Sequence, residues 1–245
     1  MDLPLLVAFF IGAAATLYAT AGQAGGTAFL AIMAFAAFPA EEMRPTALLL
    51  NVIAAGYATA RLQWGEAIPW GTLWKVTVPS LGAAFLGGLL VLDASVYFSA
   101  TGVLLLAAAL LTVARHGSEA DRGAEIPLLP VILVGAAAGF ASGVTGVGGG
   151  IFLAPVLIGL GWTTARQAAA ISPPFILCNS VLALAGVLIS GQQPAAETPL
   201  YAAAAVGGAV LGTMIGTRWM SERATRRVLC LILLFAGLRL LTRSG

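Results

Sequence analysis

The sequence predicts an all-α polytopic membrane protein made of two inverted repeats of about five helical segments each, with glycine-broken short helices near mid-membrane. The first observation is composition: 60% of the 245 residues are hydrophobic and only 9% are charged, against roughly 25% charged in an ordinary soluble domain. The second is a series of continuous apolar segments, and the third is a pair of glycine-rich breaks at corresponding places in the two halves. The composition excludes a soluble enzyme, a disordered protein and a nucleic-acid binder.

Ten apolar segments follow one another along the chain, and most approach the 20 or so residues that a membrane span needs. In chain order they cover residues 3–21, 27–38, 44–60, 70–92, 96–114, 126–142, 150–161, 168–190, 198–217 and 225–241. Segments 27–38 and 150–161 are too short, since each gives only about 18 Å of helix. Each follows a glycine-rich break, so we expect both to begin near mid-membrane. A re-entrant hairpin and a pair of crossing helices both fit each break.

The polar stretch 115–125 divides the chain into a predicted first repeat, 1–114, and a second repeat, 126–245. An offset of 123 residues pairs Gly25-Gly26 with Gly148-Gly149. When the loop 218–227 is placed in the cytoplasm, nine of the 12 Lys and Arg residues fall on that side. Both termini are then periplasmic in a bacterial inner membrane, and loop 115–125 is cytoplasmic. The second repeat therefore enters from the opposite face, an arrangement that many secondary transporters use.

The glycine-rich breaks carry the strongest chemical signal. Each glycine destabilises a helix by about 1 kcal/mol relative to alanine, and the backbone groups it frees must be buried in protein or line a cavity. The helix that starts after such a break presents free N–H groups and the positive end of its dipole. Two such N-termini predict an anion site without a buried basic side chain. Close packing of helices through small residues is the alternative interpretation of the glycines.

The candidate substrate-binding residues are these glycines and the polar residues of the nearby segments. They are Gly22, Gln23, Gly25, Gly26, Thr27, Asn51, Ser142, Thr145, Gly146, Gly148, Gly149, Gly150, Ser172 and Asn179. Two arginines, Arg44 and Arg166, each follow a short segment. Interfacial snorkelling explains them, and guidance of an anion toward each mouth of its path is the alternative. The sequence predicts no catalytic residue, no metal site and no cofactor.

The stretch from Gly139 to Pro155 (GFASGVTGVGGGIFLAP) and its counterpart AGQAGGT in the first half resemble the TauE/SafE family of sulfite and organosulfonate exporters. The first half departs from the pattern, because it has one glycine fewer, contains Gln23, and has Ile32 where the second half has Pro155. The resemblance covers nearly the whole chain. The resemblance implies export of small sulfur-containing anions such as sulfite or sulfoacetate.

The expected partners are a small anionic substrate and the lipid bilayer, without nucleic acid, and a homodimer is left open. Two other functions fit a helical membrane protein. One is a thiol–disulfide electron carrier, for which the chain offers Cys178 and Cys230 but no cysteine in the first half. The other is an assembly factor that transports nothing. Replacing both cysteines separates the electron carrier from a transporter.

Overall fold

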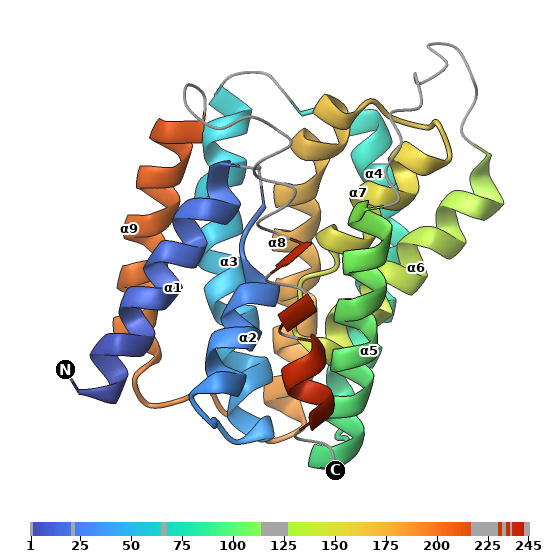
Figure 1. Cartoon of the computed structure of the whole chain (residues 1–245). Coiled ribbons are helices and arrows are strands. Elements are labelled where there is room, and N and C mark those ends of the chain that lie inside the picture. The colour runs from blue at the N-terminus through green and yellow to red at the C-terminus, as the bar shows by residue number, and fades with distance from the viewer. Residues whose placement is uncertain are drawn as a thin grey trace.

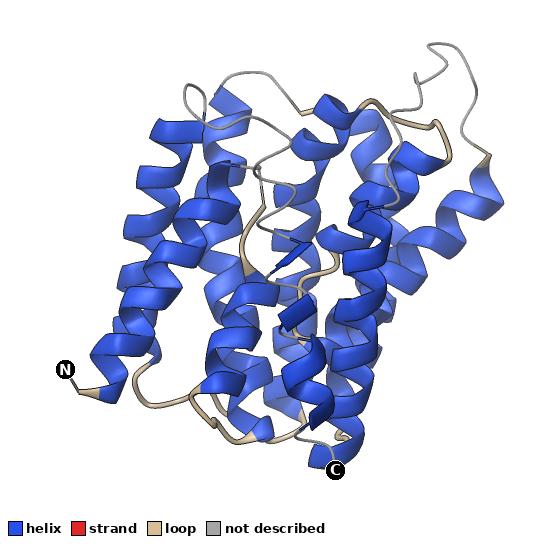
Figure 2. Ribbon diagram, in the orientation of Figure 1, coloured by secondary structure: helices blue, strands red, loops and turns tan. Residues whose placement is uncertain are grey.

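The computed structural model describes residues 2–20, 23–64, 68–113, 127–216, 230–231, 234–235 and 237–242, and all regular structure in these ranges is helical (Figure 2). The predicted loops 115–125 and 218–227 and the site candidate Gly22 lie outside the described residues. The elements are α1 (Leu3–Thr20), α2 (Gly26–Phe35), α3 (Ala40–Trp64), α4 (Trp70–Leu89), α5 (Ala94–Val113), α6 (Leu128–Thr145), α7 (Gly150–Gly159), α8 (Ala165–Ile189) and α9 (Thr198–Gly216). The described residues between 230 and 242 are also helical.

Helix lengths repeat between the two halves. Helices α1 and α6 both have 18 residues, α2 and α7 both have 10, and α3 and α8 both have 25. In Figure 1, α1 begins at one face of the bundle and α6 begins at the opposite face. This order and direction are consistent with the predicted inverted repeats. The start of α1 and residues 237–242 lie at the same face, which we call the N-terminal face (Figure 1).

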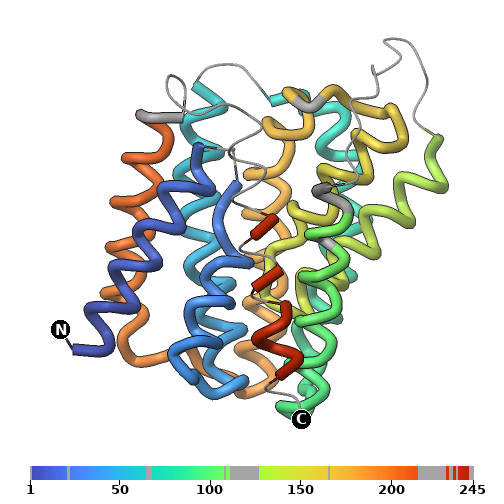
Figure 3. The backbone as a smooth tube through the Cα atoms, viewed as in Figure 1, coloured from blue at the N-terminus to red at the C-terminus, as the bar shows by residue number. Residues whose placement is uncertain are grey.

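The helices on either side of the first glycine break run in opposite directions. Helix α1 runs away from the N-terminal face, and α2 begins partway along the bundle and returns to that face (Figure 3). Helices α1, α6 and residues 166–189 of α8 are long and apolar enough to cross a membrane, as judged by length and composition. The short segments predicted at 27–38 and 150–161 are confirmed as helices that cannot cross alone.

Contacts between the halves hold the bundle together. Helix α1 packs on α9, α4 packs on α6 and α8, and α3 packs on α8. Several of these contacts need glycine: a Cβ added to Gly139 of α6 would collide with the backbone of Ser80 in α4, and one on Gly208 of α9 with the backbone of Gly12 in α1. Small residues let membrane helices approach in this way. Close packing therefore explains glycines such as Gly139 and Gly208 in the long helices.

Candidate functional site

The two glycine breaks meet inside the bundle. Gly25 caps the N-terminus of α2 with a φ of 100°, and Gly149 caps that of α7 with a φ of 74°. Both angles are in the left-handed region that favours glycine. A Cβ added to Gly26 would collide with the carbonyl oxygen of Val147 from the other break. Helices α2 and α7 are buried along most of their length, so two dipole-bearing N-termini lie together in the protein interior.

Asn51 of α3 lies between the two breaks. Its Nδ2 atom donates a hydrogen bond to the carbonyl oxygen of Gly146 at 3.1 Å. A Cβ on Gly26 would collide with the same amide, and one on Gly148 would lie 3.0 Å from Nδ2. One fully buried side chain therefore touches the start of α2 and the break before α7. Asn51, a site candidate from the sequence, therefore lies beside both breaks.

We call the place where the N-termini of α2 and α7 meet around Asn51 the junction. Hydroxyl and amide oxygens near the junction lack hydrogen-bond partners among the described residues. They are Oδ1 of Asn51, Oγ of Ser142 and Oγ of Ser180, all on fully buried residues. A Cβ on Gly148 would lie 3.3 Å from Oγ of Ser180. Buried polar groups are normally paired, and an orphaned one calls for a reason. The two serine hydroxyls can donate to an acceptor such as an anion, whereas Oδ1 of Asn51 needs a donor.

Two tyrosines that were not predicted from the sequence as site residues support the breaks. The hydroxyl of Tyr18 in α1 shares a 2.5 Å hydrogen bond with the hydroxyl of Thr27 in α2. The hydroxyl of Tyr97 in α5 donates to the carbonyl oxygen of Thr145 at 3.0 Å. Thr145 uses its own hydroxyl to donate to Ala141 O and to accept from Val147 N. A buried tyrosine in an apolar span normally has a hydroxyl partner, which is the signal that could have revealed both residues.

The four remaining candidates that the structure describes make other contacts. Ser172 donates to the carbonyl oxygen of Ala168, and Nδ2 of Asn179 donates to that of Phe175, both in α8. The Oδ1 atom of Asn179 is buried without a partner among the described residues. Gln23 is half-buried, and its backbone N–H donates to Tyr18 O. Gly150 begins α7 and packs against Ile176 and the backbone of Ser172.

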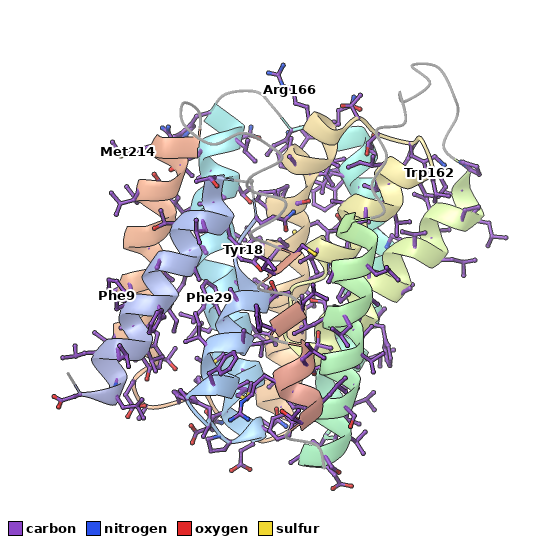
Figure 4. The ribbon with its side chains drawn as sticks, in the orientation of Figure 1. Phe9, Tyr18, Phe29, Trp162, Arg166 and Met214 are labelled. Atoms are coloured by element: carbon purple, nitrogen blue, oxygen red, sulfur yellow. The ribbon has the colours of Figure 1, made fainter. Side chains whose placement is uncertain are left out.

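The two arginines differ in environment. Arg166 is exposed at the start of α8, on the face opposite the N-terminal face (Figure 4), and this agrees with an interfacial arginine. Arg44 of α3 is only 1% exposed, so the snorkelling interpretation is wrong for this residue. Snorkelling fails because Arg44 points into the bundle and its guanidinium finds backbone acceptors there.

Arg44 donates to four oxygens. Its Nη2 donates to Gly88 O at 2.8 Å, its Nη1 to Leu90 O at 2.8 Å and to Val144 O at 3.4 Å, and its Nε to Oε1 of Gln192 at 3.2 Å. Gly88 and Leu90 lie at the C-terminal end of α4, and Val144 lies near the C-terminal end of α6, where the helix dipole is negative. Arg44 thereby ties α3 to helix ends from both halves.

A pocket of about 840 Å³ opens beside Arg44, and we call it the Arg44 pocket. The pocket is lined by the α2–α3 turn, the start of α3, the α4–α5 connection, Tyr97 and Phe98 of α5, and residues 190–194 after α8. These connections lie at the N-terminal face (Figure 1). Among the described residues, no three or more His, Cys, Asp or Glu side chains are grouped so that they could hold a metal ion.

Comparisons with known proteins agree with this architecture. The profile of the family described as "Sulfite exporter TauE/SafE" matches residues 5–240. The chain belongs to the TauE/SafE family. As a member of this family, the chain is a membrane transporter. Its long apolar helices fit this assignment.

Two relatives carry the same description. A "Probable membrane transporter protein" of Sinorhizobium fredii is 34% identical over 241 residues, which cover 97% of each chain. A protein of the same description from Methanocaldococcus jannaschii is 28% identical over 149 residues, 60% of this chain and 54% of its own. No solved structure matches the chain. Nothing in these names supports the electron-carrier or assembly-factor alternatives, and Cys178 and Cys230 are both free thiols.

Proposed function

We propose that this TauE/SafE-family protein is a secondary transporter that exports small sulfur-containing anions, such as sulfite or organosulfonates, across a bacterial inner membrane. The carrying observation is the meeting of the N-termini of α2 and α7 around Asn51. Each helix N-terminus is equivalent to about half a positive charge. Two of them, with the N–H groups that a helix start leaves without an intrahelical acceptor, form a site suited to an oxyanion. In α7, Gly150 N and Phe152 N already donate to Gly148 O and Gly149 O.

The site uses groups that can bind and release an anion. Backbone N–H groups and the amide of Asn51 donate hydrogen bonds without a full positive charge, so they hold an anion without trapping it. A central carboxylate would repel such a substrate, and the predicted spans carry none in their interior. The name of the family supports a sulfur oxyanion as substrate.

Alternating access is the mechanism that this proposal implies. The site lies between the halves, because Asn51 belongs to the first repeat and Gly146 and Gly148 belong to the second. Rocking of one repeat against the other would open the site to each face in turn. The periplasmic placement of both termini is part of the proposal and rests on the distribution of Lys and Arg.

The test is uptake of radiolabelled sulfite into liposomes that contain the purified protein. Thiosulfate, sulfate, sulfoacetate and chloride serve as competitors, and a folded variant with Gly148→Leu serves as the negative control. Saturable uptake that sulfur oxyanions block, and that the variant lacks, supports the proposal. Uptake that Gly148→Leu leaves intact would place the site elsewhere, and failure of every anion to be taken up would overturn the function.

A further inference from the structure

The charge of Arg44 is not neutralised by the groups that it contacts. All four of its hydrogen-bond acceptors are neutral oxygens, three from the backbone and one from the amide of Gln192. No carboxylate of the described residues pairs with it. The guanidinium therefore lacks a counter-charge among the described residues. A buried charge is costly unless it is paired.

The Arg44 pocket supplies the space for that counter-charge. Arg44, Tyr97 and Gln192 all line it, and its volume of about 840 Å³ exceeds that of any small oxyanion. Glu41 and Glu42 also line the pocket, but they occupy the first turn of α3, where the helix dipole favours negative side chains. Glu41 is exposed and Glu42 is half-buried, whereas Arg44 is buried. The buried guanidinium is the anion-attracting group.

The pocket adjoins the second glycine break. A Cβ on Gly146 would lie 3.1 Å from Cγ of Arg44, and Val144 O accepts from Nη1 of Arg44 at 3.4 Å. Tyr97, in the pocket wall, donates to Thr145 O. Arg44 and Tyr97 therefore stand between the pocket and the junction where the two breaks meet.

We propose that the Arg44 pocket is a second anion-binding site, a vestibule at the N-terminal face where the Arg44 guanidinium binds a small oxyanion before it reaches the glycine breaks. This proposal rests on the proposed anion transport, but its chemistry extends to any small oxyanion. A guanidinium fork matches two oxygens of such an ion. Binding would exchange neutral carbonyl or amide partners of Arg44 for charged oxygens and would loosen the contacts of Arg44 with the ends of α4 and α6.

The experiment reports on the pocket itself, independently of transport. Gln193 lines the pocket and is exposed, so Gln193→Cys is introduced into the full chain with Cys178→Ser and Cys230→Ser. The rate of labelling by a membrane-impermeant maleimide is measured against increasing sulfite, sulfate, phosphate, acetate and chloride. An oxyanion in the pocket is expected to slow the labelling in a saturable way.

Gln192→Glu is the decisive variant, because it keeps the side-chain shape and places a carboxylate against Nε of Arg44. An ion pair would take the place of the anion, so the concentration for half-protection is expected to rise at least about tenfold while the fold is kept. Arg44→Gln has the same expected effect. Arg166→Gln is the matched control, since Arg166 is exposed on the other face, and its half-protection should stay within about twofold.

A merely structural Arg44 predicts the opposite pattern. Unchanged protection in Gln192→Glu, or protection that disappears in Asn51→Ala because the anion acts from the central junction, would overturn the vestibule. Absence of protection by every anion would overturn it too, whatever the sulfite uptake shows. Arg44-dependent protection by phosphate or acetate without sulfite would support the vestibule and contradict the sulfur specificity.

Discussion

The side-chain amide of Asn51 in α3 donates a 3.1 Å hydrogen bond to the carbonyl oxygen of Gly146, at the end of α6. This bond joins the first half of the chain to the glycine break of the second half. The same side chain contacts Gly26 at the start of α2. The side chain of Asn51 therefore contacts both glycine breaks.

Replacing Asn51 with alanine should lower transport at least about tenfold, because it removes a ligand donor and leaves Gly146 O unpaired. Asn179→Ala is the comparison, since the amide of Asn179 donates within its own helix, to Phe175 O. We expect its effect to be smaller. Initial uptake rates in liposomes, normalised to folded protein, measure both. Equal losses in the two variants would argue against a special role for Asn51.

Gly26→Ala tests the close approach of the two breaks. The added Cβ would collide with the amide of Asn51 and with Val147 O, so the variant should lose about 1–3 kcal/mol of stability. Gly82→Ala in α4 is the control, because nothing lies within 4 Å of its added Cβ and alanine favours a helix. Thermal unfolding in detergent compares them. A Gly26→Ala protein as stable as Gly82→Ala would contradict the contact.

Ser180→Ala separates binding from stability. The Ser180 hydroxyl is buried without a partner among the described residues, so its removal should leave the unfolding temperature unchanged or slightly higher. If the hydroxyl contacts substrate beside Gly148, KM should rise several-fold, by about 1 kcal/mol of lost hydrogen bonding. A fall in stability with an unchanged KM would instead identify a structural partner for Ser180.

Exchange of both cysteines for serine tests the electron-carrier alternative. Cys178 is a half-buried thiol in α8, and Cys230 lies 4.0 Å from Ala109 O in α5. Neither belongs to the junction of the breaks, so the double variant should transport sulfite at the wild-type rate. Loss of activity in folded double-variant protein would support the electron-carrier alternative.

The sequence was sufficient for the parts of the fold that depend on local composition. Apolar length and glycine content located the short helices α2 and α7 to within a few residues, and the polar cost of an asparagine inside a span pointed to Asn51. Both breaks are tolerated because α2 and α7 are buried in protein.

Contacts between distant segments could not be predicted in this way. The burial of Arg44 depends on acceptors from α4, α6 and the α8–α9 connection, which one sequence does not place together. The proximity of Ser180 to Gly148, and the pairing of Tyr18 with Thr27, depend likewise on helix packing. Ser172 shows the opposite case, because a serine in a helix can satisfy itself on the preceding turn.

The most direct test of the central claim is to locate an anion by anomalous scattering from crystals grown with selenite, a heavier analogue of sulfite. If the anion site lies at the junction, we expect a selenium peak there, in contact with the N-termini of α2 and α7 and with Asn51. Well-ordered crystals of transport-competent protein, saturated with selenite, that show no peak at this junction would contradict it.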